Sequence, residues 1–340
     1  MRVGVGFPGC REGTAYHVGF VTPDGLTAVA RRAEELGYYS LWSNDHLTTP
    51  HGVSATQAEI PNFYEPLITY ATFANITARL RFMLGVITLP QRDVVLLAKQ
   101  VATLDRLTGG RVMLGVGLGA YREEFEAVHP GLKGAHRGTM VEEGIGGLRA
   151  LFAGERASFE GRYVRFAGVE LAPKPSQRPF PIYVTAHASS GLERVGRLGD
   201  GLIVAARTPD QTRREWAEVQ RAAEAAGRDP RGLSLHVQTW LALGASAREA
   251  EDRAQRSQHF RRMAAVDPRR TDAERLAEFR GGNLLGTPAA VVEQARAFRA
   301  AGASHLGLIF LVDSTEELLA DMELFARQVA PHLADEANGR

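Results

Sequence analysis

The sequence contains little cysteine and little lysine, and the first shortage excludes several kinds of site. Its 340 residues include one cysteine, Cys10, which cannot form an internal disulfide. A lone cysteine also cannot supply a zinc ribbon, an iron–sulfur cluster or a thioredoxin-type redox pair. Only three of the 40 basic side chains are lysines, and 39 acidic side chains leave a formal net charge of +1. Because nucleic-acid-binding proteins normally carry a basic excess, this balance argues against a nucleic-acid partner.

Long apolar runs are also missing. The run near the C-terminal end, residues 306–312, is far shorter than the roughly 20 residues that span a bilayer. The start of the chain, with Pro8 and Gly9 after a few apolar residues, does not resemble a signal peptide. We therefore expect a cytoplasmic protein without a membrane segment, since an unpaired cysteine suits a reducing compartment.

Strand-like and helix-like segments alternate along the chain. Short runs rich in β-branched residues are each followed by apolar residues at helical spacing. We expect strands at residues 2–7, 40–43, 82–88, 111–116, 181–185, 201–205, 233–243 and 305–311. We expect helices at residues 23–36, 65–74, 94–107, 122–128, 139–152, 191–198, 209–226, 248–265, 288–301 and 315–330. Eight strands separated by helices favour a closed parallel barrel over an open sheet.

The sequence thus predicts an α/β protein with the (β/α)8 TIM-barrel fold, in which residues 1–340 form a single domain. The surplus over about 250 residues falls in insertions after the second, fourth and seventh strands, at about 44–63, 120–180 and 246–286. The second insertion contains a predicted β-hairpin at 158–166, and the third a polar stretch at 268–282 that we expect to be mobile. Because the insertions follow strand ends, we expect them to form a lid over the C-terminal face of the barrel.

Two glycine motifs and one serine motif suggest other activities, which their context disfavours. The GxGxxG match at residues 4–9 is followed by a loop and not by the helix that would hold a pyrophosphate, and the GxGxxA match at residues 115–120 lies on the fourth strand. A nucleophile elbow requires GxSxG, and His187 replaces the first glycine around Ser189. Ser189 or Ser190 is then a helix N-cap, or the N-terminus of that helix holds a phosphate. None of the ten histidines has HxH or HExxH spacing, so we expect no metal site.

The residues at the predicted strand ends define a candidate site, because chemistry in barrels lies at the C-terminal ends of the strands. These ends carry small residues, aromatic residues, the acid–histidine pair Asp45-His46 and one helix N-terminus near Ser189. They carry no pair of acids, lysine or activated cysteine. Such a lining suits a flat, phosphate-bearing cofactor that performs the difficult chemistry itself.

The sequence resembles a known family, the bacterial luciferase-like flavin-dependent oxidoreductases, and in particular their coenzyme F-420-dependent branch. The phrase LDRLTGGRVMLGVGLG, residues 104–119, is its most specific part. Other matching segments lie at 30–45, 61–77, 80–99, 181–190 and 198–202. The resemblance implies a (β/α)8 barrel with a flavin or deazaflavin across its C-terminal face. It also implies an oxidoreductase that commonly dimerises.

The resemblance also implies roles for individual residues. A non-proline cis peptide would form a bulge behind the cofactor ring at Gly85-Val86, where the alternative is an ordinary glycine bulge. The catalytic candidates are His46, which would exchange a proton with the substrate, and Asp45, which would set its tautomer or hold the cofactor. The alternative for this pair is an N-cap and a surface histidine, and Glu123 and Glu124 are reserve acids that we expect to face solvent. Gly117 and Gly119 would leave a strand end bare to admit the ring, and backbone amides would hold the phosphate. The full set of cofactor-binding candidates is Gly85, Val86, Thr88, Gly117, Gly119, Thr185, Ala188, Ser189 and Ser190.

We therefore expect hydride transfer between coenzyme F-420 and a small organic substrate. The main alternative is an FMN-dependent monooxygenase that receives reduced flavin from a flavin reductase and uses oxygen. An alternative of another class is a non-catalytic ligand-binding barrel. The chain departs from relatives at Met83-Leu84-Gly85, at Ala120 and Tyr121 and at Asp93-Val94, which line the expected pocket, so the substrate is not predicted. We also expect a homodimer.

Overall fold

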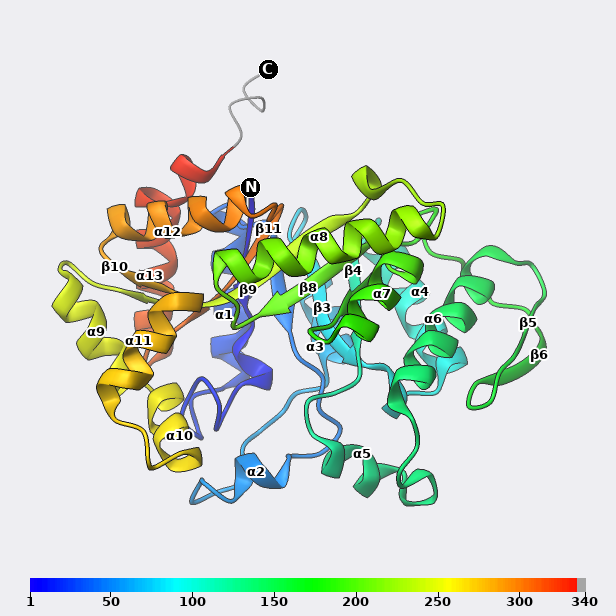
Figure 1. The fold of residues 1–340 in the computed structure, drawn as a ribbon, viewed down its shortest axis with the longest axis horizontal. Coiled ribbons are helices and arrows are strands. Elements are labelled where there is room, and N and C mark those ends of the chain that lie inside the picture. The colour runs from blue at the N-terminus through cyan, green and yellow to red at the C-terminus, as the bar shows by residue number, and fades with distance from the viewer. Residues whose placement is uncertain (335–340) are drawn as a thin grey trace.

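The computed structural model describes residues 1–334, and within them eight parallel strands close into a barrel (Figure 1). The order around the barrel is β1-β2-β3-β4-β7-β8-β9-β11, and β11 returns to pair with β1. The predicted (β/α)8 fold is confirmed. The barrel strands are β1 (Arg2–Gly6), β2 (Ser40–Ser43), β3 (Arg81–Thr88), β4 (Val112–Gly117), β7 (Ile182–Thr185), β8 (Gly201–Ala205), β9 (Ser234–Leu243) and β11 (His305–Phe310).

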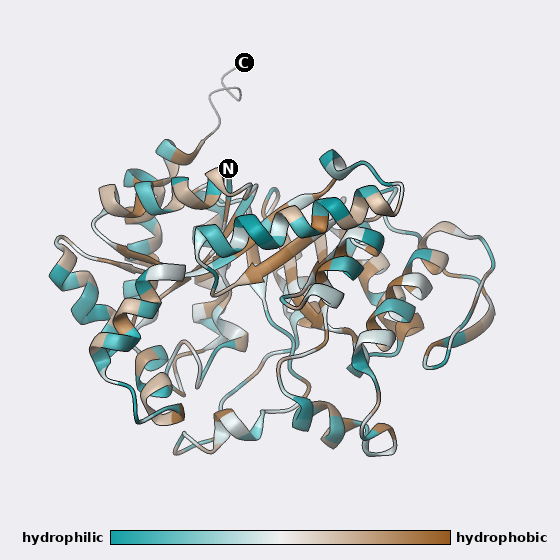
Figure 2. Ribbon diagram, viewed as in Figure 1, coloured by the Kyte–Doolittle hydropathy of each residue, from teal (hydrophilic) through white to brown (hydrophobic). Residues whose placement is uncertain are grey.

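Amphipathic helices surround the barrel and bury their apolar faces against the strands. In α1, for example, Leu26, Val29, Ala30 and Ala33 recur at helical spacing and are all buried. Figure 2 shows the resulting arrangement, with apolar strands at the centre and polar helix faces outside. The surrounding helices are α1 (Pro23–Glu35), α3 (Pro66–Ala74), α4 (Val94–Leu107), α6 (Arg137–Ala153), α7 (Ser189–Leu198), α8 (Pro209–Ala225), α12 (Pro288–Ala300) and α13 (Thr315–Gln328). None of the helices in residues 1–334 is long and apolar enough to cross a membrane.

The three insertions carry their own elements. One helix from each insertion lies at the same end of the barrel, whereas the β-hairpin of the second insertion lies to the side (Figure 1). The first follows β2, the second follows β4 and the third follows β9. The hairpin predicted at 158–166 is present. The insertions contain α2 (His51–Ser54), α5 (Arg122–Val128), β5 (Ala157–Glu160), β6 (Arg165–Val169), α9 (Ala247–Arg256), α10 (Gln258–Val266), α11 (Asp272–Gly282) and the short parallel strand β10 (Leu284–Gly286).

Two expectations about the third insertion are wrong. The polar stretch 268–282 mostly forms the helix α11, because Thr271 and Glu274 make a reciprocal capping box and Leu276 and Phe279 are buried on one face. The helix expected over 248–265 is two helices, since Ser257 leaves the helical conformation and its hydroxyl caps α10 by accepting from Phe260 N at 3.3 Å. The strand β10 and the helix α2 were not predicted.

Two buried histidines stack inside the barrel near the N-terminal ends of its strands. The rings of His236 and His305 lie 4.1 Å apart and nearly parallel, and each touches one serine hydroxyl, at 2.8 Å for Ser234 and 3.1 Å for Ser304. Burial, with His305 nearby, lowers the pKa of His236 well below its usual range. Burial, followed by the charge of Arg2, lowers the pKa of His305 to about 3. Both histidines are therefore neutral in the folded protein at neutral pH.

We expect the free energy of unfolding to fall as the pH drops below about 6.5, the pKa of an unperturbed histidine. Below that pH, His236 and His305 become protonated in the unfolded chain but stay neutral in the folded barrel. This difference persists until the pH reaches their lowered pKa values in the folded state. Each histidine then costs about 1.4 kcal/mol of stability per pH unit. Urea unfolding at about pH 7.5 and about pH 5 measures the difference. His305→Gln should reduce it, and equal stability of the wild type at both pH values would contradict the expectation.

Candidate active site

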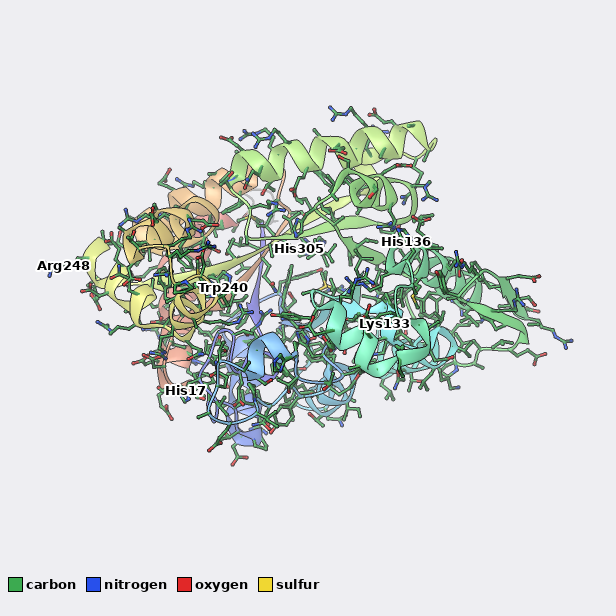
Figure 3. The ribbon with its side chains drawn as sticks, turned by 60° about the horizontal axis from the view of Figure 1, so that its bottom comes forward. His17, Lys133, His136, Trp240, Arg248 and His305 are labelled. Atoms are coloured by element: carbon green, nitrogen blue, oxygen red, sulfur yellow. The ribbon has the colours of Figure 1, made fainter. Side chains whose placement is uncertain are left out.

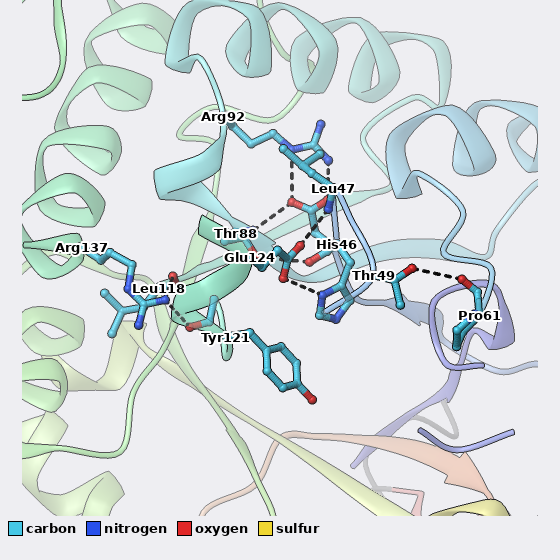
Figure 4. Close-up of polar contacts among 12 residues, drawn as sticks. His46, Leu47, Thr49, Pro61, Thr88, Arg92, Leu118, Tyr121, Glu124 and Arg137 are labelled. Carbon is cyan, nitrogen blue, oxygen red and sulfur yellow. Dashed lines mark hydrogen bonds and ion pairs between the residues drawn. The ribbon is translucent and has the colours of Figure 1, made fainter. Parts of the chain in front are cut away.

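The acid–histidine pair lies one residue beyond the end of β2, and its aspartate links two strand ends. Figure 4 shows the histidine of the pair near Thr88, Arg92 and Glu124. Asp45 is 2% exposed, and its Oδ2 accepts from Thr88 N at 3.0 Å and from Arg92 Nε at 3.2 Å. Arg92 also contacts the other Asp45 oxygen and lies 3.0 Å from Glu65 Oε1. The Thr88 hydroxyl donates to the Asp45 carbonyl at 3.2 Å. Both carboxylate oxygens of Asp45 are therefore occupied in joining the ends of β2 and β3.

His46 points away from Asp45 and contacts a different acid. Its Nδ1 lies 3.0 Å from Glu124 Oε2, and the other Glu124 oxygen accepts from Leu47 N at 2.9 Å. Glu124 is 1% exposed, so the expectation that it faces solvent is wrong, whereas Glu123 is exposed as expected. The reason is tertiary: the first turn of α5 packs against the loop after β2, where Glu124 contacts His46 and Leu47. The carboxylate that can set the tautomer of His46 is therefore that of Glu124.

This contact leaves the second nitrogen of His46 available for chemistry. A carboxylate on Nδ1 favours the tautomer that carries its hydrogen there, which leaves a lone pair on Nε2. No hydrogen bond within residues 1–334 engages Nε2. The ring is flanked by Phe63, at 4.8 Å between centroids, and by Tyr121, at 6.0 Å. The arrangement can accept or return a proton at Nε2.

The bulge expected in the third strand is present, and its peptide has the predicted geometry. The Gly85-Val86 bond is cis, and the pairing of β3 with β4 shifts register between Leu84 and Ile87. Beyond the bulge, Thr88 pairs with Gly117. The cofactor-binding candidates at the end of β3 therefore lie next to those at the end of β4, at the C-terminal edge of the barrel.

Gly117, at the end of β4, and Gly119, in the loop that follows, allow neighbouring side chains to approach the backbone closely. A Cβ at Gly117 would lie 2.5 Å from Thr185 Cγ2 and 2.9 Å from Val86 Cγ2. A Cβ at Gly119, where φ is +80°, would lie 2.6 Å from Thr88 Cγ2. Val86, Thr88 and Thr185 therefore occupy the space beside the two glycines and lie together at this edge. The glycines are needed for the close packing of these three side chains.

The last three candidates open α7 beside a cavity of about 440 Å³. Ala188 is the N-cap and no side chain caps the helix, so of the two alternatives for this segment the serine cap is wrong. The first amides of α7 are therefore left for another acceptor. The cavity wall includes Thr185, Ala188 and Ser190. Uncapped amides at a helix N-terminus fit a phosphate group.

Arginines surround this cavity, and no motif in the sequence identified them. They come from α5, α6 and α7, and the last of these helices begins more than 30 residues after α6 ends. Arg137 also donates to the carbonyls of Leu118 at 3.1 Å and Gly119 at 3.0 Å, which fixes the loop after β4. The charged residues of the wall are Arg122, Arg137, Arg194 and Arg197, with Glu142 and Glu193. Arg194 and Arg197 share one acid, Glu142, at 3.0 and 3.2 Å, and Arg122 lies 3.6 Å from Glu126. The arginines still outnumber the acids around them, so the cavity is suitable for an anion.

The barrel, the bulged third strand and the anion cavity together define a TIM-barrel protein with a candidate phosphate site at its C-terminal face. The sequence model of the luciferase-like monooxygenases matches residues 1–305. The chain belongs to this family, and it is an oxidoreductase.

Individual relatives agree with this assignment. The chain is 32% identical over 257 residues to an F-420-dependent hydroxymycolic acid dehydrogenase of Mycobacterium tuberculosis, covering 75% of this chain and 68% of that one. Among solved structures, a monooxygenase from Streptomyces bottropensis superposes with a TM-score of 0.82 at 24% identity, over 98% of this chain and 100% of the other. An F-420-dependent secondary alcohol dehydrogenase superposes with a TM-score of 0.79 at 18% identity, over 98% and 99%. At these identities the two structures establish the fold alone.

Proposed function

We propose that this oxidoreductase binds coenzyme F-420 and transfers hydride between it and a small organic substrate. The observation that carries the proposal is the cavity at the start of α7, where four arginines line the wall against two glutamates. FMN ends in a single phosphate, whereas F-420 continues beyond its phosphodiester into a chain that bears several carboxylates. The surplus of arginine suits the longer polyanion better, and the F-420-dependent relative at 32% identity supports the same choice.

The residues divide into a ring surface and a phosphate site. Val86, Thr88, Gly117 and Gly119 would support the ring, and the amides of Ser189 and Ser190 would hold the phosphate. Arg122 and Arg197 have side chains that are 50% and 44% exposed, so they lie where carboxylates of the cofactor tail could leave the cavity. Together they orient the cofactor, which contributes proximity.

His46 and Glu124 would manage the proton that accompanies the hydride. The bound deazaflavin supplies a carbon that accepts or donates hydride. His46 Nε2 takes the proton from a substrate hydroxyl, and it returns that proton in the reverse direction. Glu124 keeps hydrogen on Nδ1 and stabilises the charge that His46 gains. Asp45 and Arg92 keep the two strand ends in register and do not touch His46 Nε2.

The FMN-dependent monooxygenase is the rival, and cofactor-induced stabilisation separates the two. The chain is unfolded by heat with no cofactor, with F-420, or with FMN. F-420 at about 100 times its Kd should add about 2.7 kcal/mol of stability, and FMN at the same concentration much less. Stabilisation by FMN and none by F-420 would contradict the proposal. It would also favour a partnership with a flavin reductase, which the F-420 reaction does not require. The cytoplasmic location and the homodimer stay predictions.

A further inference from the structure

A second cavity, of about 540 Å³, lies beyond the ends of β8 and β9 under the helices α10 and α11. Figure 3 shows Trp240 beside these helices, on the opposite side of the barrel from His136, which lines the anion cavity. A volume of this size suits a small organic ligand. The lining that matters here is formed by Arg207, Trp240, His259, Met263, Phe279 and Asn283.

Aromatic rings form the walls of this second cavity and are held in place. The Trp240 ring stacks on His259 with centroids 4.0 Å apart, and Phe279 lies 5.9 Å from the same histidine. Asn283 accepts from Trp240 N at 2.9 Å and donates to the Phe279 carbonyl at 3.0 Å. The side-chain amide of Asn283 thus holds both aromatic residues in place. Its oxygen and its nitrogen are both already hydrogen-bonded within the protein. A flat apolar ligand can stack on a wall of this kind.

The charged and polar groups of the wall are largely satisfied within the protein. Arg207 donates to Glu215 at 2.7 Å, and Glu278 pairs with Arg270. Thr208 and Gln211 cap α8 reciprocally. A carboxylate or phosphate would therefore find little unpaired positive charge in this cavity.

His259 is the exception, because it makes no hydrogen bond in the described part of the chain. Burial, followed by the charge of Arg262, lowers its pKa to about 4, so its ring is neutral at neutral pH. A neutral imidazole offers one donor and one acceptor. It suits an uncharged oxygen substituent better than an ion.

The helix that covers the cavity also contacts residues beside the candidate catalytic pair. Arg262, the neighbour of Met263, donates to the Tyr121 hydroxyl at 2.9 Å, and the Tyr121 ring lies 6.0 Å from His46. Gln258 of the same helix donates to Gln57 of the first insertion at 3.3 Å. The helix α10 therefore links all three insertions, and the second cavity, beyond the end of β8, opens on the face of the barrel that also carries His46 after β2.

We propose that this second cavity binds the substrate, and that the substrate is an uncharged aromatic compound with a hydroxyl or carbonyl group. Its ring packs against Phe279 and the edge of the Trp240–His259 stack, and its oxygen bonds to His259. The inference rests on the proposed function, because it names the substrate class of that enzyme. It concerns different residues from those that hold the cofactor.

Calorimetric titration of the cofactor-free protein with 2-naphthol and with 2-naphthoate at neutral pH tests this inference. The neutral naphthol should bind at least about tenfold more tightly than the anion of the same ring system. Trp240→Ala should weaken naphthol binding at least about tenfold, and His259→Phe, which keeps a ring on Trp240, about two- to tenfold. Trp216→Phe is the matched control, because Trp216 lies on α8 outside the cavity, and it should change nothing.

Two results would overturn the inference. Naphthoate binding as tightly as naphthol would mean that Arg207 recognises an anion. Unchanged naphthol binding in both Trp240→Ala and His259→Phe would place the ligand elsewhere. Because two variants are tested, the inference can still be tested if one of them does not fold. Because no cofactor is present, these outcomes are independent of whether F-420 binds, so failure of the substrate assignment and failure of the F-420 assignment are distinguishable.

Discussion

His46→Ala should lower kcat about 10²- to 10⁴-fold with any substrate that the wild type turns over, while the Kd for F-420 changes less than about twofold. Positioned acid–base groups contribute a factor of this size. In the proposed reaction His46 would exchange the proton through Nε2, while its Nδ1 contacts Glu124. The anion cavity that would hold the cofactor phosphate does not include it. Steady-state kinetics and a cofactor titration measure the two quantities.

Glu124 supplies the internal check on that prediction. Glu124→Gln keeps the shape of the side chain but removes the charge beside Nδ1, so kcat should fall about tenfold or more with KM unchanged. Glu123→Gln alters an exposed neighbour on the same helix and should have no effect. Added imidazole should partly restore the activity of His46→Ala. Full activity in His46→Ala, or equal losses in the two glutamate variants, would exclude the proton-transfer role.

Ser190→Asp should separate protein stability from cofactor affinity. A carboxylate at the start of α7 interacts favourably with the helix dipole, so stability should stay level or rise by about 0.3–1 kcal/mol. The same carboxylate occupies the wall of the anion cavity and repels the cofactor phosphate. The affinity for F-420 should therefore fall at least about tenfold.

Urea unfolding and a cofactor titration on the same preparation measure both effects. Ser190→Asn is the control, because it has the size of aspartate without the charge and should bind F-420 nearly as the wild type does. Unchanged affinity in Ser190→Asp would mean that the phosphate does not lie at the N-terminus of α7.

The sequence predicted the barrel because each strand–helix unit is locally encoded. The bounds of β2, α4, α5 and β8 agree exactly with their expected ranges, since apolar periodicity and turn residues act over a few positions. The Gly85-Val86 cis peptide was predicted by resemblance, not by local physics.

The errors concern contacts between distant segments. Glu123 and Glu124 are equivalent in a sequence, and only the packing of α5 against the loop after β2 buries one of them. The arginines of the anion cavity come from three helices, so no spacing in the sequence marks them. In the third insertion, the capping box of Thr271 and Glu274 was present in the sequence, but the polar composition of the stretch obscured it.

Competition between the two cofactors tests the central claim most directly. The protein is saturated with F-420, FMN is added in increasing concentration, and bound F-420 is followed by its fluorescence. The arginine-lined cavity predicts that FMN in large excess displaces little F-420 from the wild type, and displaces more when Arg197 is replaced by alanine, because the cofactor tail then loses a partner. Displacement of F-420 from the wild type by an equal concentration of FMN would contradict the assignment.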